Sequence, residues 1–235
     1  MGLDWCLKRK AIVGKEELLN KLLEEYKASE DTDRRKSIDD EIEQMCLNPF
    51  EVIGSPMIGR DAVALEWLRA DYAANPKLYT RVTVDETTGT RKENKMTWDE
   101  VLAVNNNKYI SELASDRDGL GDITGLAASP TSFRGKVIGY CDTIIGTALA
   151  DKAYVDLTSE EMLVYAKELK EAAQNSLKRL RGEEKARAEI LLKEGYACLE
   201  DSDYDLGLDR YADVSSACKW LTYWGTKGFS MWAWY

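Results

Sequence analysis

Apolar residues recur at steps of three and four along several stretches of the chain, the spacing that gathers side chains on one face of a helix. This pattern predicts helices over 15–28, from after Asp33 to about Met45, over 61–74 and over 213–226. Asn-Pro pairs follow two of these stretches, and the residue before a proline avoids helical backbone. The chain is therefore expected to be rich in amphipathic helices.

Two capping boxes predict further helices. Thr97 is followed three residues later by Glu100, and Thr158 by Glu161. In a capping box, the threonine hydroxyl accepts a hydrogen bond from the backbone amide of the glutamate, and the glutamate carboxylate accepts one from the backbone amide of the threonine. We expect one helix from Trp98 to about Ala114. A second begins after Thr158, is broken or bent at Gly182 and gives way to another helix that runs toward Glu200.

The stretch from Phe133 to about Lys152 is apolar and small, with Gly135 and Gly139 four residues apart. Small side chains let a neighbouring backbone approach closely. This pattern predicts one central, buried helix.

Two stretches have the period-two alternation of strands. Residues 79–84 and 91–96 flank a turn-rich segment and predict a surface hairpin. Residues 229–235 predict a last strand, with Phe229, Met231 and Tyr235 on one face and Trp232 and Trp234 on the other. We expect helices or strands to cover both of its faces.

Together these elements predict a helix-rich α+β fold, with a small, mostly antiparallel sheet packed by amphipathic helices. The chain contains neither an internal repeat nor a low-complexity linker. A single domain over 1–235 is the resulting expectation.

Composition narrows the choice of partners. Hydrophobic residues make up 44% of the chain and charged residues 31%, a composition typical of a folded protein. The net charge of -10 is expected to repel phosphate backbones and anionic lipids. No apolar run approaches the roughly 20 residues needed to cross a bilayer, and the first residues lack the core of a signal peptide. We therefore expect a cytoplasmic protein that binds neither nucleic acid nor membranes.

The chain contains five cysteines, no CxxC pair and no histidine. Scattered cysteines indicate reduced, mostly buried thiols. The absence of histidine removes the commonest general base and metal ligand. No catalytic residue can be named from this composition.

Residues 54–61 come close to a phosphate-binding loop, since Gly54 and Gly59 stand at the right separation before a helix. The required lysine is replaced by Arg60 and the hydroxyl residue by Asp61, while Pro56 removes one amide. We interpret Asp61 as a helix cap instead.

Asp116, Asp118 and Asp122 occupy ligand-like offsets of a calcium loop. In that register the first ligand position is Ala114 and the closing glutamate is replaced by Gly125. An ordinary Asp/Gly turn explains the same residues. These three aspartates remain the candidate site for Ca²⁺ or Mg²⁺, and no other cofactor is expected.

Four of the seven tryptophans lie in the last sixteen residues, namely Trp220, Trp224, Trp232 and Trp234. Aromatic side chains dominate cores and interfaces, and they also stack on sugars or bases. We favour a core or partner interface over a stacking platform.

The two ends of the chain resemble a loose family of uncharacterised proteins that begin with MGLD, found in bacteria, phages, algae and the large DNA viruses of algae. The similarity rests on Met1–Asp4, on Ser132–Lys136 and on the closing stretch from Trp220 to Trp234. It implies that the first strand pairs with the last, so that the sheet includes both chain ends, and that the source is viral or algal. The family has no known activity, so no catalytic residue is transferred.

The expected function is a non-enzymatic protein-interaction or structural module, such as a virion component. The alternative is a histidine-free hydrolase or transferase that uses carboxylates and a divalent metal ion. A rise in melting temperature with Ca²⁺ or Mg²⁺ that Asp118→Ala abolishes would favour the alternative.

Overall fold

The computed structural model describes residues 3–84, 89–115, 131–195 and 207–235. Its contacts divide the chain into two compact units, which we call unit 1 (Met1–Pro49 and Gly121–Tyr235) and unit 2 (Phe50–Leu120). Each unit is described by itself below. The single domain expected over 1–235 stays a prediction.

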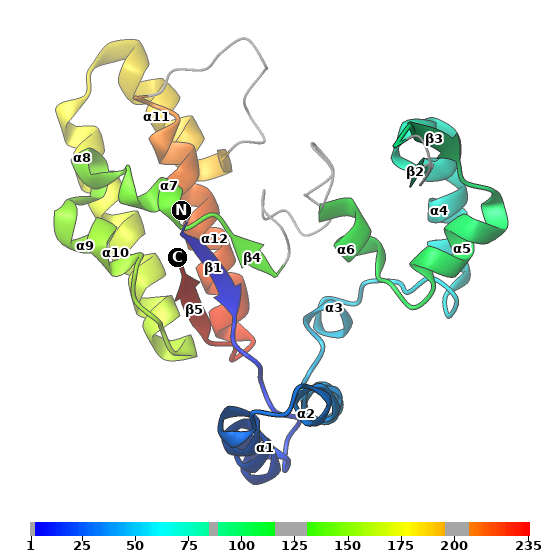
Figure 1. Ribbon diagram of the computed structural model, residues 1–235. Coiled ribbons are helices and arrows are strands. Elements are labelled where there is room, and N and C mark those ends of the chain that lie inside the picture. The colour runs from blue at the N-terminus through cyan, green and yellow to red at the C-terminus, as the bar shows by residue number, and fades with distance from the viewer. Residues whose placement is uncertain (1–2, 85–88, 116–130, 196–206) are drawn as a thin grey trace. The chain divides into compact units, whose positions relative to one another are not determined.

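Unit 1 contains a three-stranded antiparallel sheet (Figure 1). Strand β1 (Asp4–Leu7) lies between β4 (Ser132–Phe133) and β5 (Met231–Trp234), with Trp5 opposite both Phe133 and Ala233. The helix-rich α+β fold is thereby confirmed, as is the pairing of the first strand with the last.

The inner face of this sheet packs against long helices. Trp5 is fully buried there, with its ring centroid 6.1 Å from that of Tyr165 in α10 (Ser159–Ser176) and 6.2 Å from that of Trp220 in α12 (Arg210–Thr226). Helix α11 (Gly182–Glu194) packs along α12, and the 3-10 helix η2 (Leu177–Arg179) precedes α11. The core of unit 1 therefore joins the two chain ends to the C-terminal helices.

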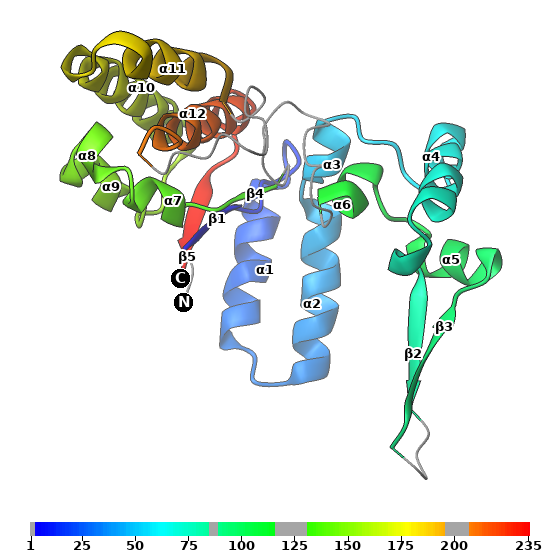
Figure 2. The ribbon, with the colours of Figure 1, turned by 90° about the horizontal axis from the view of Figure 1, so that it is seen from above.

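Helices α1 (Glu16–Ala28) and α2 (Thr32–Met45) form an antiparallel pair (Figure 2). The apolar stripes expected from the sequence meet in a small cluster formed by Leu19, Leu22, Ile38 and Ile42. Both predicted helices are confirmed.

The prediction of a single helix over 133–152 is wrong. The chain there forms β4 and then three short helices, α7 (Lys136–Gly139), α8 (Asp142–Ile145) and α9 (Thr147–Lys152). Gly146 interrupts the run with a φ of +84°, a backbone conformation that favours glycine. The segment is central, as expected, because a Cβ on Gly135 would lie 2.3 Å from Nε1 of Trp5. Gly135 therefore allows the close approach of the Trp5 ring, and Gly146 allows the chain to turn between short helices.

Unit 2 combines helices with a separate hairpin. The helices are α3 (Pro49–Val52), α4 (Ala62–Ala74), α5 (Trp98–Asn105) and α6 (Ile110–Ser115), with the 3-10 helix η1 (Pro76–Leu78) after α4. Strands β2 (Thr80–Val84) and β3 (Arg91–Lys95) form the expected hairpin. Both capping boxes are confirmed, at Thr97 here and at Thr158 in unit 1.

The helix expected from Trp98 to Ala114 is interrupted between α5 and α6. The amide of Asn107 donates to the carbonyl of Ile58, and the amide of Ile58 donates to the carbonyl of Lys108, both at 2.9 Å. Asn107 adopts a φ of +64° to allow this pairing. A tertiary backbone contact thus replaces one turn of the expected helix.

Among the described residues, none of the helices has both the length and the apolar character that a membrane crossing would need.

Candidate functional site

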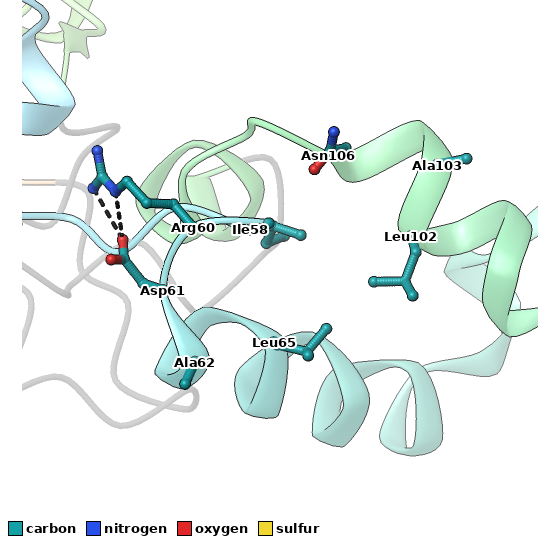
Figure 3. Close-up of a pocket in the computed structure, with 9 residues that line it drawn as sticks. Ile58, Arg60, Asp61, Ala62, Leu65, Leu102, Ala103 and Asn106 are labelled. Carbon is teal, nitrogen blue, oxygen red and sulfur yellow. Dashed lines mark hydrogen bonds and ion pairs between the residues drawn. The ribbon is translucent and has the colours of Figure 1, made fainter.

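Unit 2 contains a pocket of about 760 Å³ (Figure 3). It opens where α4 begins and α5 ends, so the segment that resembled a phosphate-binding loop forms one wall. Its apolar lining comes from Ile58, Ala62, Leu65, Leu102 and Ala103, and its polar lining from Arg60, Asp61 and Asn106. A volume of this size is typical of small-molecule pockets.

Gly59 shapes the wall of this pocket. Its φ is +89°, and a Cβ at this position would lie 2.1 Å from Oδ1 of Asn106. Any larger residue would be strained in its backbone and would displace the Asn106 side chain. The second glycine of the motif is therefore explained by close packing, with no need for a phosphate.

Arg60 forms ion pairs with two carboxylates. Its guanidinium contacts Asp61 at 2.9 Å and also pairs with Glu51, which accepts a 2.7 Å hydrogen bond from the Tyr109 hydroxyl. The hydrogen bonds from Arg60 hold the pKa of both carboxyl groups below their usual range. Burial raises the pKa of Tyr109 to about 12. None of these shifts brings a group of this cluster close to neutral pH, where a general acid or base works best.

The helix cap expected at Asp61 is only partly confirmed. Asp61 stands at the N-cap position of α4 with extended backbone, yet its side chain makes no capping hydrogen bond. Its carboxylate instead accepts a 2.7 Å hydrogen bond from the amide of Met57. Asp61 therefore ties the preceding loop to Arg60 rather than satisfying the first amides of the helix.

The candidate metal ligands Asp116, Asp118 and Asp122 lie outside the described residues. Within the ranges that the structure describes, no group of three or more His, Cys, Asp or Glu residues could hold a metal ion. The Ca²⁺ or Mg²⁺ site stays a prediction.

The four C-terminal tryptophans separate into two pairs. Trp220 and Trp224 in α12 are fully buried in the core of unit 1, whereas the exposed fractions of Trp232 and Trp234 in β5 are 45% and 60%. The expectation that other elements cover both faces of this strand is wrong, because the outer face remains open. Only Trp232 and Trp234 are accessible to a partner.

We define the aromatic face as Asp4, Cys6, Trp232 and Trp234, the residues on the outer face of the β1–β5 pair. Cys6 lies opposite Trp232, and Asp4 lies opposite Trp234. Burial and the nearby carboxylate of Asp4 raise the pKa of the Cys6 thiol. The thiol therefore stays protonated near neutral pH, and the chemistry of this face is that of contact, not of nucleophilic attack.

Ion pairs lie at the edges of the aromatic face. Arg134 contacts the carboxylate of Asp4 at 3.1 Å, and Lys8 contacts Asp156 at 2.8 Å. Asp156 also accepts a 3.0 Å hydrogen bond from the amide of Ala233, which satisfies one backbone donor of β5. The result is an apolar centre with a polar rim.

No protein-family model, no curated protein and no solved structure matches this chain. The resemblance of the two chain ends to proteins that begin with MGLD therefore stays a prediction.

Proposed function

We propose that this chain is a protein-binding module and that the aromatic face is its contact surface. The observation that supports this proposal is the exposure of Trp232 and Trp234, side by side on one face of β5. Tryptophan is among the residues most enriched at the energetic centres of protein interfaces. The other five tryptophans of the chain are less exposed.

The arrangement around the two tryptophans matches the anatomy of an interface. Protein interfaces place apolar and aromatic residues at the centre and charged residues at a solvated rim. Here the indoles form the centre, and the pairs Asp4–Arg134 and Lys8–Asp156 form the rim. We infer that the partner offers an apolar surface bordered by charges of both signs.

A protein partner fits this face better than a sugar does. A sugar-binding platform needs polar side chains that are free to bind hydroxyl groups close to the stacked ring. The carboxylates of Asp4 and Asp156 are already engaged with Arg134 and Lys8. This favours shape and apolar contact over recognition of hydroxyl groups.

The expected setting follows from the composition. Scattered cysteines suit a reducing compartment, and a net charge of -10 disfavours binding to nucleic acid. We therefore propose a cytoplasmic or virion-associated protein that does not depend on nucleic acid.

The proposal is tested with the double variant Trp232→Ala/Trp234→Ala. A protein captured by the wild-type chain from an extract of the cells that produce it is purified, and its Kd is measured by calorimetry. Each buried tryptophan at an interface centre contributes about 2 kcal/mol or more, so the loss of two should cost about 4 kcal/mol and weaken the Kd by roughly 700-fold.

Tyr26→Ala is the matched control, since Tyr26 is a partly exposed aromatic residue on α1. It should leave the Kd unchanged, and both variants should keep the wild-type circular dichroism spectrum. An unchanged Kd in the double variant contradicts the proposal. Binding to a glycan array that the double variant abolishes would instead support the sugar platform.

A further inference from the structure

The hairpin of unit 2 forms a two-stranded sheet of its own within the described residues, and it extends away from α4 and α5 (Figure 2). Its strands pair in a regular antiparallel register from Thr80–Lys95 to Val84–Arg91. A sheet of two strands has two open edges and is marginally stable by itself in water. The two edges of this hairpin differ in a way that indicates what each can bind.

The register determines which backbone groups point outward. The amide of Met96 donates a 2.9 Å hydrogen bond to the carbonyl of Tyr79. These two residues are therefore the first pair whose backbone groups point inward, toward the partner strand of the hairpin. Because inward and outward positions alternate along an antiparallel pair, Arg81 and Thr83 bond to β3. The outward backbone groups of β2 then belong to Thr80, Val82 and Val84, and those of β3 to Arg91, Glu93 and Lys95.

The β3 edge carries a charged side chain at every outward position. An antiparallel copy of β3 centred on Glu93 would place Glu93 opposite itself and Arg91 opposite Lys95. Like charges directly opposite each other destabilise a strand pair. This edge is protected against self-association, in the way that natural edge strands are.

The β2 edge lacks this protection. Its outward positions carry no charge, and the side chains of Val82 and Val84 are 53% and 54% exposed. The one charged residue of β2, Arg81, lies on the opposite face and pairs with Glu100 at 3.2 Å. Within the described part of the chain, an incoming strand would therefore meet backbone groups that pair with no other strand, together with two half-exposed valines.

We propose that β2 is a self-association edge, which pairs antiparallel with β2 of a second copy of this chain. Centred on Val82, the pairing places Val82 opposite Val82 and Thr80 opposite Val84, and all three positions have outward backbone groups. On the other face Arg81 comes opposite Thr83, so no like charges face each other. The two hairpins then form one four-stranded sheet in the order β3-β2-β2-β3.

We favour a second copy of this chain over another kind of strand as the partner, because pairing between two identical β2 edges leaves neither of them open. Two identical β2 edges related by a two-fold axis use each other fully, and the outer edges of the resulting sheet are the two protected β3 strands. Pairing β2 with the β3 edge of another copy would be heterologous and would leave further open edges. The strand has only five residues, so the contact is small and the dimer weak.

The test is sedimentation velocity of the full chain over a range of concentrations. We expect a reversible increase in sedimentation coefficient as the concentration rises. Val82→Lys and Val82→Glu should each lower the association constant at least about tenfold, because like charges then lie at the centre of the pair. An equimolar mixture of these two variants should associate again, since opposite charges now face each other.

Val104→Lys is the matched control, because Val104 is an equally exposed valine on α5 of the same unit. It should associate like the wild type. The proposal is overturned if the wild type stays monomeric, if Val82→Lys associates as well as the wild type, or if the mixture associates no better than its components. It does not depend on the aromatic face, and Trp232→Ala/Trp234→Ala should leave the association unchanged.

Hydrogen exchange gives a second measurement that reports the edge used. At high protein concentration, the amides of Val82 and Val84 should exchange more slowly than at low concentration. The outward amide of Glu93 on β3 should exchange equally in both conditions. Protection of Glu93 without protection of Val82 would place the contact on the wrong edge and overturn the proposal.

Discussion

The indole of Trp5 donates a 2.7 Å hydrogen bond from Nε1 to the backbone carbonyl of Ala153, which lies 148 residues away in the sequence. This bond is buried and ties β1 to the end of α9. Trp5→Phe should leave the carbonyl without this donor and leave the space of the fused six-membered ring unfilled, at a cost of at least about 1–3 kcal/mol in the free energy of unfolding. Urea denaturation measures the loss. Trp98→Phe, at a half-buried tryptophan of unit 2, should cost less.

Gly135 is predicted to be coupled to the same indole. Gly135→Ala would place a Cβ 2.3 Å from Nε1 of Trp5, and overpacking a rigid buried ring costs about 1–3 kcal/mol. Because the atoms in the way, Nε1, Cδ1 and Cε2, belong to the indole, the cost of Gly135→Ala should be smaller in a Trp5→Leu background, which removes Nε1 and Cε2. A double-mutant cycle in urea measures this coupling, and strictly additive effects would contradict it.

The contact between Trp5 and Gly135 illustrates why some parts of the fold could be predicted from the sequence and others could not. Elements defined by local signals were predicted correctly, such as α1 from its leucine stripe and the starts of α5 and α10 from their capping boxes. The break at Asn107 was missed because it depends on the Ile58 backbone, which is remote in sequence. The break at Gly146 was missed because a run of small residues does not reveal the one position that adopts a positive φ.

The candidate surfaces also depend on tertiary surroundings that local sequence signals do not reveal. Alternation in 229–235 correctly placed Trp232 and Trp234 on one face of a strand, but periodicity alone does not tell whether a face is covered. The pocket lies at Gly59, in the segment that resembles an incomplete phosphate-binding loop. Only the position of Asn106 shows that this glycine serves close packing.

The capping box at Thr158 should stabilise α10 measurably. The Thr158 hydroxyl accepts a hydrogen bond from the amide of Glu161, and the Glu161 carboxylate accepts one from the amide of Thr158. Thr158→Ala should lower the free energy of unfolding by about 1 kcal/mol, because one amide of the first turn loses its acceptor. Thr158→Ser keeps the oxygen and should stay close to the wild type in the same urea titration. Equal losses in the two variants would show that the methyl group matters, not the cap.

Asp156 should make the free energy of unfolding depend on pH under acidic conditions. Hydrogen bonds from Lys8 and from the amide of Ala233 hold the pKa of Asp156 below its usual range. The ionised carboxylate therefore favours the folded state. Its contribution is complete above the unfolded pKa of about 3.9 and is lost as the pH falls through the lower folded value.

The measurement compares the wild type with Asp156→Asn in urea between pH 6 and pH 2.5. At pH 6 we expect the variant to be less stable by no more than about 1 kcal/mol, since both side chains of the pair are about half exposed and solvent screens them. The difference should disappear toward the acid end. Lys8→Gln should remove part of the same contribution, and a difference that grows in acid would contradict the assignment.

The buried thiols should be almost inert in the folded protein. Burial of the thiol raises the pKa of Cys141 and of Cys218 to about 12, although as whole residues only Cys141 is buried and Cys218 is partly buried, like Cys6 and Cys46. At pH 8 a thiol with this pKa is ionised roughly a thousandfold less than an ordinary cysteine, and the thiolate is the reactive form. Alkylation with iodoacetamide, followed by site-resolved mass spectrometry, should therefore label Cys6 and Cys46 well before Cys141 and Cys218. In 8 M urea all four should react at similar rates, and native labelling of Cys141 as fast as Cys6 would show that its surroundings open to solvent.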